Sequence, residues 1–241
     1  MKKPQKIEMD TEEIRKKLIE QLKPTGWYEL LRGFLLNDEF LDIISYLKDE
    51  VEEGNRFTPT LKQVFRPFIE CSLQDAKVIL IGDSPYPQLG VADGLAFSCR
   101  DGEIRESDLR YIQGAISKTV YDNKEIEPVK DLKHWAAQGV LLLNYAFTTK
   151  IDRYSSHHKL WNPFMTYLID MLSNGDHIKV AMLMGRSAYE MEDLFSENVK
   201  VFTSLHPSSA EFAELKQWYC NDIFNKVNSE LESKKLPQII W

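Results

Sequence analysis

The sequence lacks most of the features that would place it in a specialised class of protein. Its three cysteines, Cys71, Cys99 and Cys220, are far apart and odd in number. This argues against a disulfide framework and indicates a reducing, intracellular setting. No run of about 18 consecutive apolar residues occurs, so we expect no membrane-spanning helix and no membrane association. The charged segment 1–10 has no apolar stretch, so we expect no signal peptide.

Motifs for common cofactors are also missing. The five histidines form no HxxxH or HExxH array, and no cysteine pair has zinc spacing, so we expect neither a metal nor another cofactor. There is no GxxxxGK sequence and no GxGxxG turn after a strand, which argues against nucleoside triphosphates and dinucleotides. The absence of a GxSxG elbow argues against a serine hydrolase.

Positive charge is scarce. Thirty Lys and Arg residues stand against 37 Asp and Glu residues, for a net charge of -7. This excludes a protein that coats nucleic acid through broad electrostatics, but a local site remains open, with Lys150, Arg153 and Arg186 as candidate cations. The 43% apolar and 28% charged residues are typical of a soluble globular protein. We expect a monomer in the cytoplasm, or in the nucleus if the source is eukaryotic or viral.

Hydrophobic periodicity predicts helices in the first 55 residues and strands after them. Apolar residues recur at helical spacing over 14–22, 27–36 and 40–51. The last of these patterns ends in the acidic stretch 48–53, which we interpret as a solvated face. Four short apolar runs predict strands over 77–81, 140–143, 179–184 and 199–205.

The spacing of these runs predicts the fold class. Each run is followed by enough chain for a helix, and helices are predicted over 108–119, 161–172, 187–194 and 212–231. This pattern indicates an α/β fold with a central four-stranded, mainly parallel sheet flanked by helices. We therefore expect a helical N-terminal extension of residues 1–55 packed on an α/β domain of residues 56–241.

Polar or turn-forming residues follow all four predicted strands. The first strand is followed by 82–87 (GDSPYP), the second by Asn144, the third by 185–187 (GRS) and the fourth by 206–209 (HPSS). Because ligands bind beyond the carboxyl ends of the strands in open α/β sheets, we expect these segments to form one pocket.

The residue types in these segments favour a planar, base-like ligand. The Asn144 amide offers a donor and an acceptor that match the edge of a nucleobase. Tyr86 and Phe97 offer flat walls for a ring to stack upon. His206, beside a proline in a stiff loop, offers a ring nitrogen that can donate to an oxygen.

In order and spacing, five motifs resemble those of the family 1 uracil-DNA glycosylases, from about Phe57 to Trp241. The GQDPYH motif of that family corresponds to 82–87 (GDSPYP), and its GLAFS motif is intact at 94–98. Its WAxQGVLLLN motif spans 135–144. A Ser-His pair followed by Trp occurs at Ser156, His157 and Trp161, and its HPSP motif corresponds to 206–210.

The resemblance implies an enzyme of base excision repair that flips uracil, or a related modified pyrimidine, out of DNA and hydrolyses its N-glycosidic bond, leaving an abasic site. Phe97 would stack on the base, Asn144 would read its edge, and Tyr86 would crowd the methyl group of thymine. His206 would hydrogen-bond the base oxygen that gains charge as the bond breaks. The resemblance also implies DNA contacts by Pro59, Gly185, Arg186, Pro207, Ser208, Ser209 and Ala210.

The first motif departs from the family at its catalytic position. The aspartate that orients water corresponds to Ser84, and Asp83 stands where the family has a glutamine that lines the base pocket. We therefore take Asp83, Ser84 and His206 as the candidate catalytic residues, with Asp83 also in the base pocket. Asp93 is a second candidate substitute for the lost carboxylate.

Two further departures affect the handling of DNA. Pro87 replaces a histidine, and Ala210 replaces the leucine that wedges into the vacated stack, which predicts a preference for single-stranded DNA. Three functions follow as hypotheses: an active glycosylase; a catalytically weak or inactive homologue acting as a DNA-binding or replication accessory protein; and an interaction module that docks a partner through its acidic helices. The base-reading residues favour the first, and the three replacements favour the second.

Overall fold

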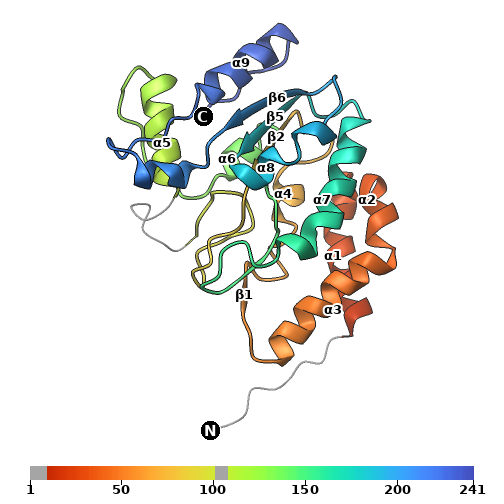
Figure 1. The fold of residues 1–241 in the computed structure, drawn as a ribbon. Helices are drawn as coiled ribbons and strands as arrows, with labels where there is room; N and C mark the ends of the chain where they lie inside the picture. Colours follow the sequence, from red (N-terminus) through yellow and green to blue (C-terminus); the bar gives the residue numbers. More distant parts are fainter. Residues whose placement is uncertain (1–9, 101–107) are drawn as a thin grey trace.

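A sheet of four parallel strands forms the centre of the molecule in the computed structural model, which describes residues 10–100 and 108–241 (Figure 1). The strand order is β3-β2-β5-β6. Strands β2, β3 and β5 are buried along their whole length, whereas the edge strand β6 is partly exposed. Short apolar strands of this kind are expected where helices cover both faces of a sheet. The strands are β2 (Val78–Gly82), β3 (Val140–Asn144), β5 (Val180–Met184) and β6 (Lys200–Ser204).

Helices cover both faces of this sheet. Figure 1 shows α5 and α9 on one side, and α7 with the N-terminal helices on the other. The sheet and the predicted α/β class are thus confirmed. The helices are α1 (Thr11–Leu22), α2 (Trp27–Leu35), α3 (Asp38–Glu52), α4 (Arg66–Glu70), α5 (Asp108–Thr119), α6 (Lys133–Ala136), α7 (His158–Ser173), α8 (Arg186–Tyr189) and α9 (Ile223–Ser233), with short 3-10 helices η1 (Lys23–Thr25), η3 (Glu192–Leu194) and η4 (Pro207–Phe212).

The three N-terminal helices bury the apolar stripes that their sequences predict. They contact α7 and α4, and their buried side chains belong to the same hydrophobic cluster as the sheet. The indole Nε1 of Trp27 donates to the carbonyl of Cys71 at 2.7 Å, which ties α2 to the chain after α4. The division into 1–55 and 56–241 stays a prediction. One part of the acidic stretch is not solvated: Glu50 is buried and pairs with Lys150 at 2.7 Å.

The predicted helix over 212–231 is wrong for its first half. Only α9 is helical there. Lys216, Asn221 and Asp222 have positive φ angles of 49°, 54° and 56°, which a right-handed helix cannot accommodate. The Trp218 indole donates to the Leu205 carbonyl at 2.8 Å, so the segment 213–222 folds back on the end of β6.

Other features were not predicted. The region 187–194 is divided between α8 and η3, and two short strands, β1 (Phe57–Thr58) and β4 (Thr149–Lys150), pair in antiparallel fashion.

All three cysteines are buried free thiols. No helix within the described residues is long and apolar enough to cross a membrane.

Candidate active site

The carboxyl ends of the four strands bring the predicted segments together. Gly82 of β2 is paired in register with Asn144 of β3, and Met184 of β5 with Ser204 of β6. The loops that follow these residues therefore start at one edge of the sheet, as the sequence predicts. Two adjoining cavities lie at this edge.

The smaller cavity is nearly closed, at about 10 Å³. Phe97 forms part of its wall and has a φ of 62°, an unusual conformation for a bulky residue. A Cβ atom on Gly82 would lie 2.9 Å from the Phe97 ring, so this ring position requires glycine. The cavity is lined by Ser84, Pro85, Tyr86, Ala92, Leu95, Phe97, Ser98, Asp108 and Asn144.

Asn144 presents an unused amide to this cavity. The residue is only 6% exposed, and its side chain has no hydrogen-bond partner among the described residues. A planar ligand with a donor and an acceptor on one edge would pair with this amide. The Tyr86 hydroxyl, at the same cavity, donates to the Phe97 carbonyl at 3.0 Å and holds the two aromatic residues together.

The ring of His206 has a defined orientation. The Ser208 backbone N–H donates to its Nδ1 at 3.3 Å, so a neutral ring carries its proton on Nε2. The ring centroid lies 5.5 Å from that of Phe97. On its other side, a Cβ atom at Gly185 would lie 3.0 Å from the His206 Cβ. Gly185, with a φ of 98°, therefore allows the close approach of the histidine.

Asp83 is held in place by hydroxyl groups. Its Oδ1 accepts from Ser187 at 2.6 Å and its Oδ2 from Ser155 at 2.5 Å. His158 Nε2 lies 3.5 Å from Oδ1. The Ser84 hydroxyl instead accepts from the Ser155 backbone N–H at 3.3 Å. Asp83 and Ser84 thus point into different cavities: Asp83 lines the larger and Ser84 the smaller.

The larger cavity, about 450 Å³, shares Tyr86 and Asp108 with the smaller one. Phe212 stands on its wall and is 89% exposed. Arg186 is also there, with a side chain 93% exposed and a loose 3.4 Å contact to Glu190. The lining is Asp83, Tyr86, Asp108, Tyr154, Gly185, Arg186, His206, Ser208, Glu211 and Phe212.

Asp108 is a site residue that the sequence did not single out. It is the first residue of α5, and its Oδ2 lies 4.0 Å from His206 Nε2. Burial raises the pKa of its carboxyl, His206 opposes that rise, and Glu211 and Asp83 add to it. No motif marks this position, so only the packing of α5 against η4 reveals it.

Several predicted residues lie away from both cavities. Asp93 forms a 2.7 Å ion pair with Arg66 and accepts from the Ser98 hydroxyl at 2.6 Å, so its carboxylate is already engaged. Ala210 is fully buried. Lys150 is neutralised by Glu50, as noted above. Pro59, Pro207 and Ser209 are also absent from the lining of these two cavities.

The two adjacent histidines His157 and His158 differ in their exposure: His157 is buried, and His158 is partly exposed. His157 is 1% exposed, and its Nδ1 lies 2.8 Å from the Thr148 hydroxyl, which also accepts from the Trp161 indole at 2.7 Å. Burial lowers the pKa of His157 to about 4. His158 packs on Tyr145, with ring centroids 4.8 Å apart, and faces Asp83.

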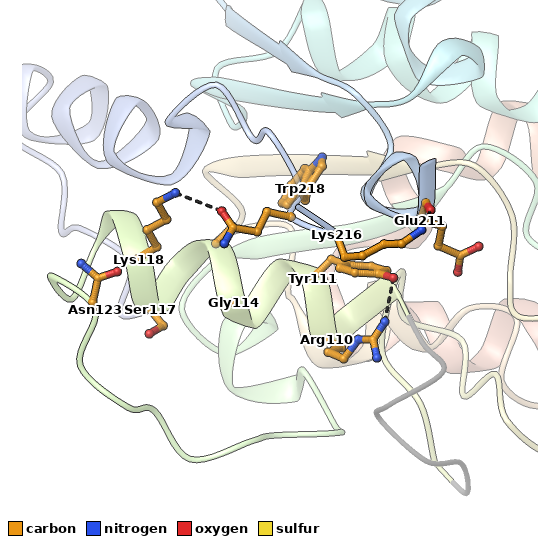
Figure 2. Close-up of a pocket in the computed structure, with 11 residues that line it drawn as sticks. Arg110, Tyr111, Gly114, Ser117, Lys118, Asn123, Glu211, Lys216 and Trp218 are labelled. Atoms are coloured by element: carbon orange, nitrogen blue, oxygen red, sulfur yellow. Dashed lines mark hydrogen bonds between the residues drawn. The ribbon is translucent and has the colours of Figure 1, made fainter. Parts of the chain in front are cut away.

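A third cavity, about 730 Å³, adjoins the site along α5 (Figure 2). It shares Glu211 with the larger active-site cavity. Arg110, Lys118 and Lys216 line it, so cations outnumber the single carboxylate. The Arg110 guanidinium donates to the Tyr111 hydroxyl at 2.7 Å, and Lys118 donates to Gln217 at 3.2 Å.

Comparison with known proteins gives consistent matches. No family model matches the chain. It is 33% identical over 218 residues to the uracil-DNA glycosylase of Christiangramia forsetii, covering 90% of this chain and 97% of the relative. It is 34% identical over 204 residues to that of Mesomycoplasma hyopneumoniae, covering 84% and 90%. The crystal structure of mimivirus uracil-DNA glycosylase superposes with a TM-score of 0.80 at 22% identity, covering 92% and 88% of the two chains, which supports the fold.

Proposed function

Because the chain belongs to the uracil-DNA glycosylase family, we propose that it removes uracil from DNA by hydrolysing the bond between the base and deoxyribose. The observation that carries the proposal for this site is the side chain of Asn144, which is only 6% exposed and has no hydrogen-bond partner among the described residues, in a cavity walled by Phe97. A flipped base would enter this cavity, and the cavity would widen to hold it. Its sugar and phosphates would stay in the larger cavity outside.

Recognition of the base rests on three side chains. Asn144 would pair with the edge of uracil, and Phe97 would stack on its face. Tyr86, held by its hydrogen bond to the Phe97 carbonyl, would leave no room for the methyl group of thymine. The pocket would therefore exclude thymine sterically.

The leaving base takes the bonding electron pair when the C1′–N1 bond breaks. His206 would donate its Nε2 proton as a hydrogen bond to the base oxygen that gains this charge. The Ser208 contact that fixes the ring supports this assignment, because it leaves the proton of a neutral ring on Nε2, which lies 4.0 Å from Asp108 Oδ2 at the junction of the two cavities. The hydrogen bond is then made without rotation of the ring.

Water completes the reaction. We place Ser84 where the family has its water-orienting aspartate, and a neutral hydroxyl supplies no negative charge there. Asp83 is the candidate for accepting the proton of the attacking water, since its carboxylate lines the larger cavity. The water oxygen bonds to C1′, and one proton of this water goes to Asp83. The departing base takes up a different proton, from solvent. The products are uracil and an abasic site.

Contacts to DNA would come from the exposed parts of the site. Arg186 is available to a phosphate, because its side chain is 93% exposed and Glu190, at 3.4 Å, is its one ion-pair partner among the described residues. The third cavity, drawn in Figure 2, shares Glu211 with the larger cavity, and its three cations would follow the strand beyond the flipped nucleotide. Ala210 is buried and cannot reach the DNA, whereas Phe212, two residues later, is exposed and apolar. We therefore assign to Phe212 the filling of the gap left by the flipped base.

A single-stranded oligonucleotide containing one uracil tests this function. Wild-type protein should release uracil, and alkali should then cleave the abasic strand. Asn144→Ala should lower the single-turnover rate by at least about 100-fold, because the variant lacks the amide that pairs with the edge of the base. The matched control is Asn174→Ala, an exposed asparagine at the end of α7, which should cleave as wild type does.

The same assay distinguishes the alternative of a DNA-binding accessory protein, which Ser84 favours. A silent wild type together with an active Ser84→Asp variant would support that alternative. If neither the wild type nor the Ser84→Asp variant releases uracil or any modified pyrimidine of a panel, the proposed function is wrong.

A further inference from the structure

Asp108 stands at the junction of the two active-site cavities. Of the described residues, only Tyr86 and Asp108 line both the small cavity and the larger one. If the base occupies the first and the sugar the second, the bond between them must pass this junction. This argument rests on the proposed function, since it needs a base in the small cavity.

A carboxylate at that position has a specific chemical use. As the C1′–N1 bond breaks, the sugar acquires the character of an oxocarbenium cation, which a negative charge close to C1′ stabilises. We propose that Asp108 is the catalytic carboxylate that stabilises this cation, in place of the aspartate missing at Ser84. Asp108 undergoes no covalent change in this step: the electron pair of the C1′–N1 bond goes to the base, and Asp108 neither gains nor loses a proton.

The other acidic residues nearby are less suited to this role. Asp83 lines only the larger cavity, and both its oxygens accept hydrogen bonds from hydroxyl groups. Glu211 lines the larger cavity and the third cavity but not the small cavity. Asp93 is bound to Arg66.

No described residue donates a hydrogen bond to Asp108. Its Oδ2 lies 4.0 Å from His206 Nε2, at the limit of an ion-pair contact. Its side chain is 18% exposed. A carboxylate that is largely removed from water and has no hydrogen-bond donor weakens the fold, so its replacement by asparagine should leave stability unchanged or raise it.

The charges that face Asp108 set its dependence on pH. They are His206 and Glu211 from the loop and helix after β6, and Asp83 from the loop after β2. Burial and the two acidic groups raise the pKa of Asp108, while His206 opposes the rise. The carboxylate is therefore lost as pH falls, at a higher pH than for an exposed aspartate, and excision should fall with it.

Single-turnover kinetics on the uracil oligonucleotide test the assignment. Asp108→Asn should lower the rate of excision by about 100-fold or more, with little change in the Kd for the oligonucleotide, because only the transition state carries the positive charge. Adding Ser84→Asp to this variant should restore at least about tenfold of the lost rate, since it returns a carboxylate to the site. Asp193→Asn, an exposed carboxylate in η3, is the matched control.

Two readouts separate catalysis from folding. The Tm of Asp108→Asn should not fall, and the loss of activity at low pH should shift to lower pH in the rescued double variant. An Asp108→Asn rate within threefold of wild type would overturn the inference while leaving the proposed function intact. A wild type and a Ser84→Asp variant that are both inactive would instead overturn the proposed function.

Discussion

At the scale of single residues, the site depends on backbone positions where a side chain is excluded. Gly185 combines a φ of 98° with a 3.0 Å approach to His206. Gly185→Ala should destabilise the protein by about 1–2 kcal/mol and displace His206, lowering excision by about tenfold. Urea unfolding and single-turnover assays measure the two effects. Gly114→Ala, in the open middle of α5 where a Cβ meets nothing, is the control for stability and should not destabilise the protein.

The aromatic wall makes a prediction about specificity. Tyr86→Ala should open the position that the thymine methyl group would occupy and allow slow release of thymine, while uracil release falls by about tenfold or more because packing on the base is lost. Quantifying the free bases from matched uracil and thymine oligonucleotides checks this. Thymine release that stays at background in the variant would show that Tyr86 does not exclude the methyl group.

Buried His157 makes stability depend on pH. Its pKa is lowered to about 4 from 6.5, so the unfolded state binds a proton that the folded state resists. The associated stability is present above pH 6.5 and is lost as pH falls toward 4. Between about pH 7 and pH 5 the loss is about 2 kcal/mol. Urea unfolding should show this slope in wild type and in the exposed-residue control His134→Gln, but a smaller slope in His157→Gln.

At the scale of elements, we expect the segment 207–222 to affect how the protein engages DNA. Phe212 is 89% exposed at the larger cavity, whereas Leu215, 77% exposed in the same segment, lies outside it. Phe212→Ala should slow excision from duplex DNA by about tenfold and change single-strand excision little, because only the duplex requires a filled gap. Leu215→Ala is the matched control. Equal effects of the two variants on duplex excision would contradict a wedge at Phe212.

The sequence predicted the sheet well and this segment poorly. The strands and α5 follow from short apolar runs and helical spacing, which local sequence encodes. The apolar residues over 212–222 have the same periodicity, but Lys216, Asn221 and Asp222 adopt left-handed conformations and Trp218 bonds the end of β6. Such choices depend on tertiary contacts that one sequence does not display.

The candidate site shows the same division. Asp83, Asn144 and His206 were predictable because each follows a strand and ligands gather at strand ends. Asp108 was not, since it begins a helix and reaches the site only through the packing of α5 on η4. The burial of His157 was not predictable, because no local pattern shows that aromatic side chains cover it.

At the scale of the whole molecule, the net charge of -7 fits a protein that contacts few phosphates. Arg110→Ala combined with Lys118→Ala should weaken binding to a long single strand and reduce the slope of log Kd against log salt by about 1.4, for two lost phosphate contacts. Lys16→Ala with Lys235→Ala removes the same charge from distant exposed positions. That control should leave the slope unchanged; an equal reduction in both would mean that net charge alone controls affinity.

The most direct test of uracil excision at this site is the identity of the product. Wild-type protein in excess over a single-stranded oligonucleotide with one uracil should yield, by mass spectrometry, free uracil and a strand carrying one abasic site. The same experiment with Asn144→Ala should leave the strand almost entirely intact. An intact wild-type strand after prolonged incubation, or equal product from Asn144→Ala, would contradict the account.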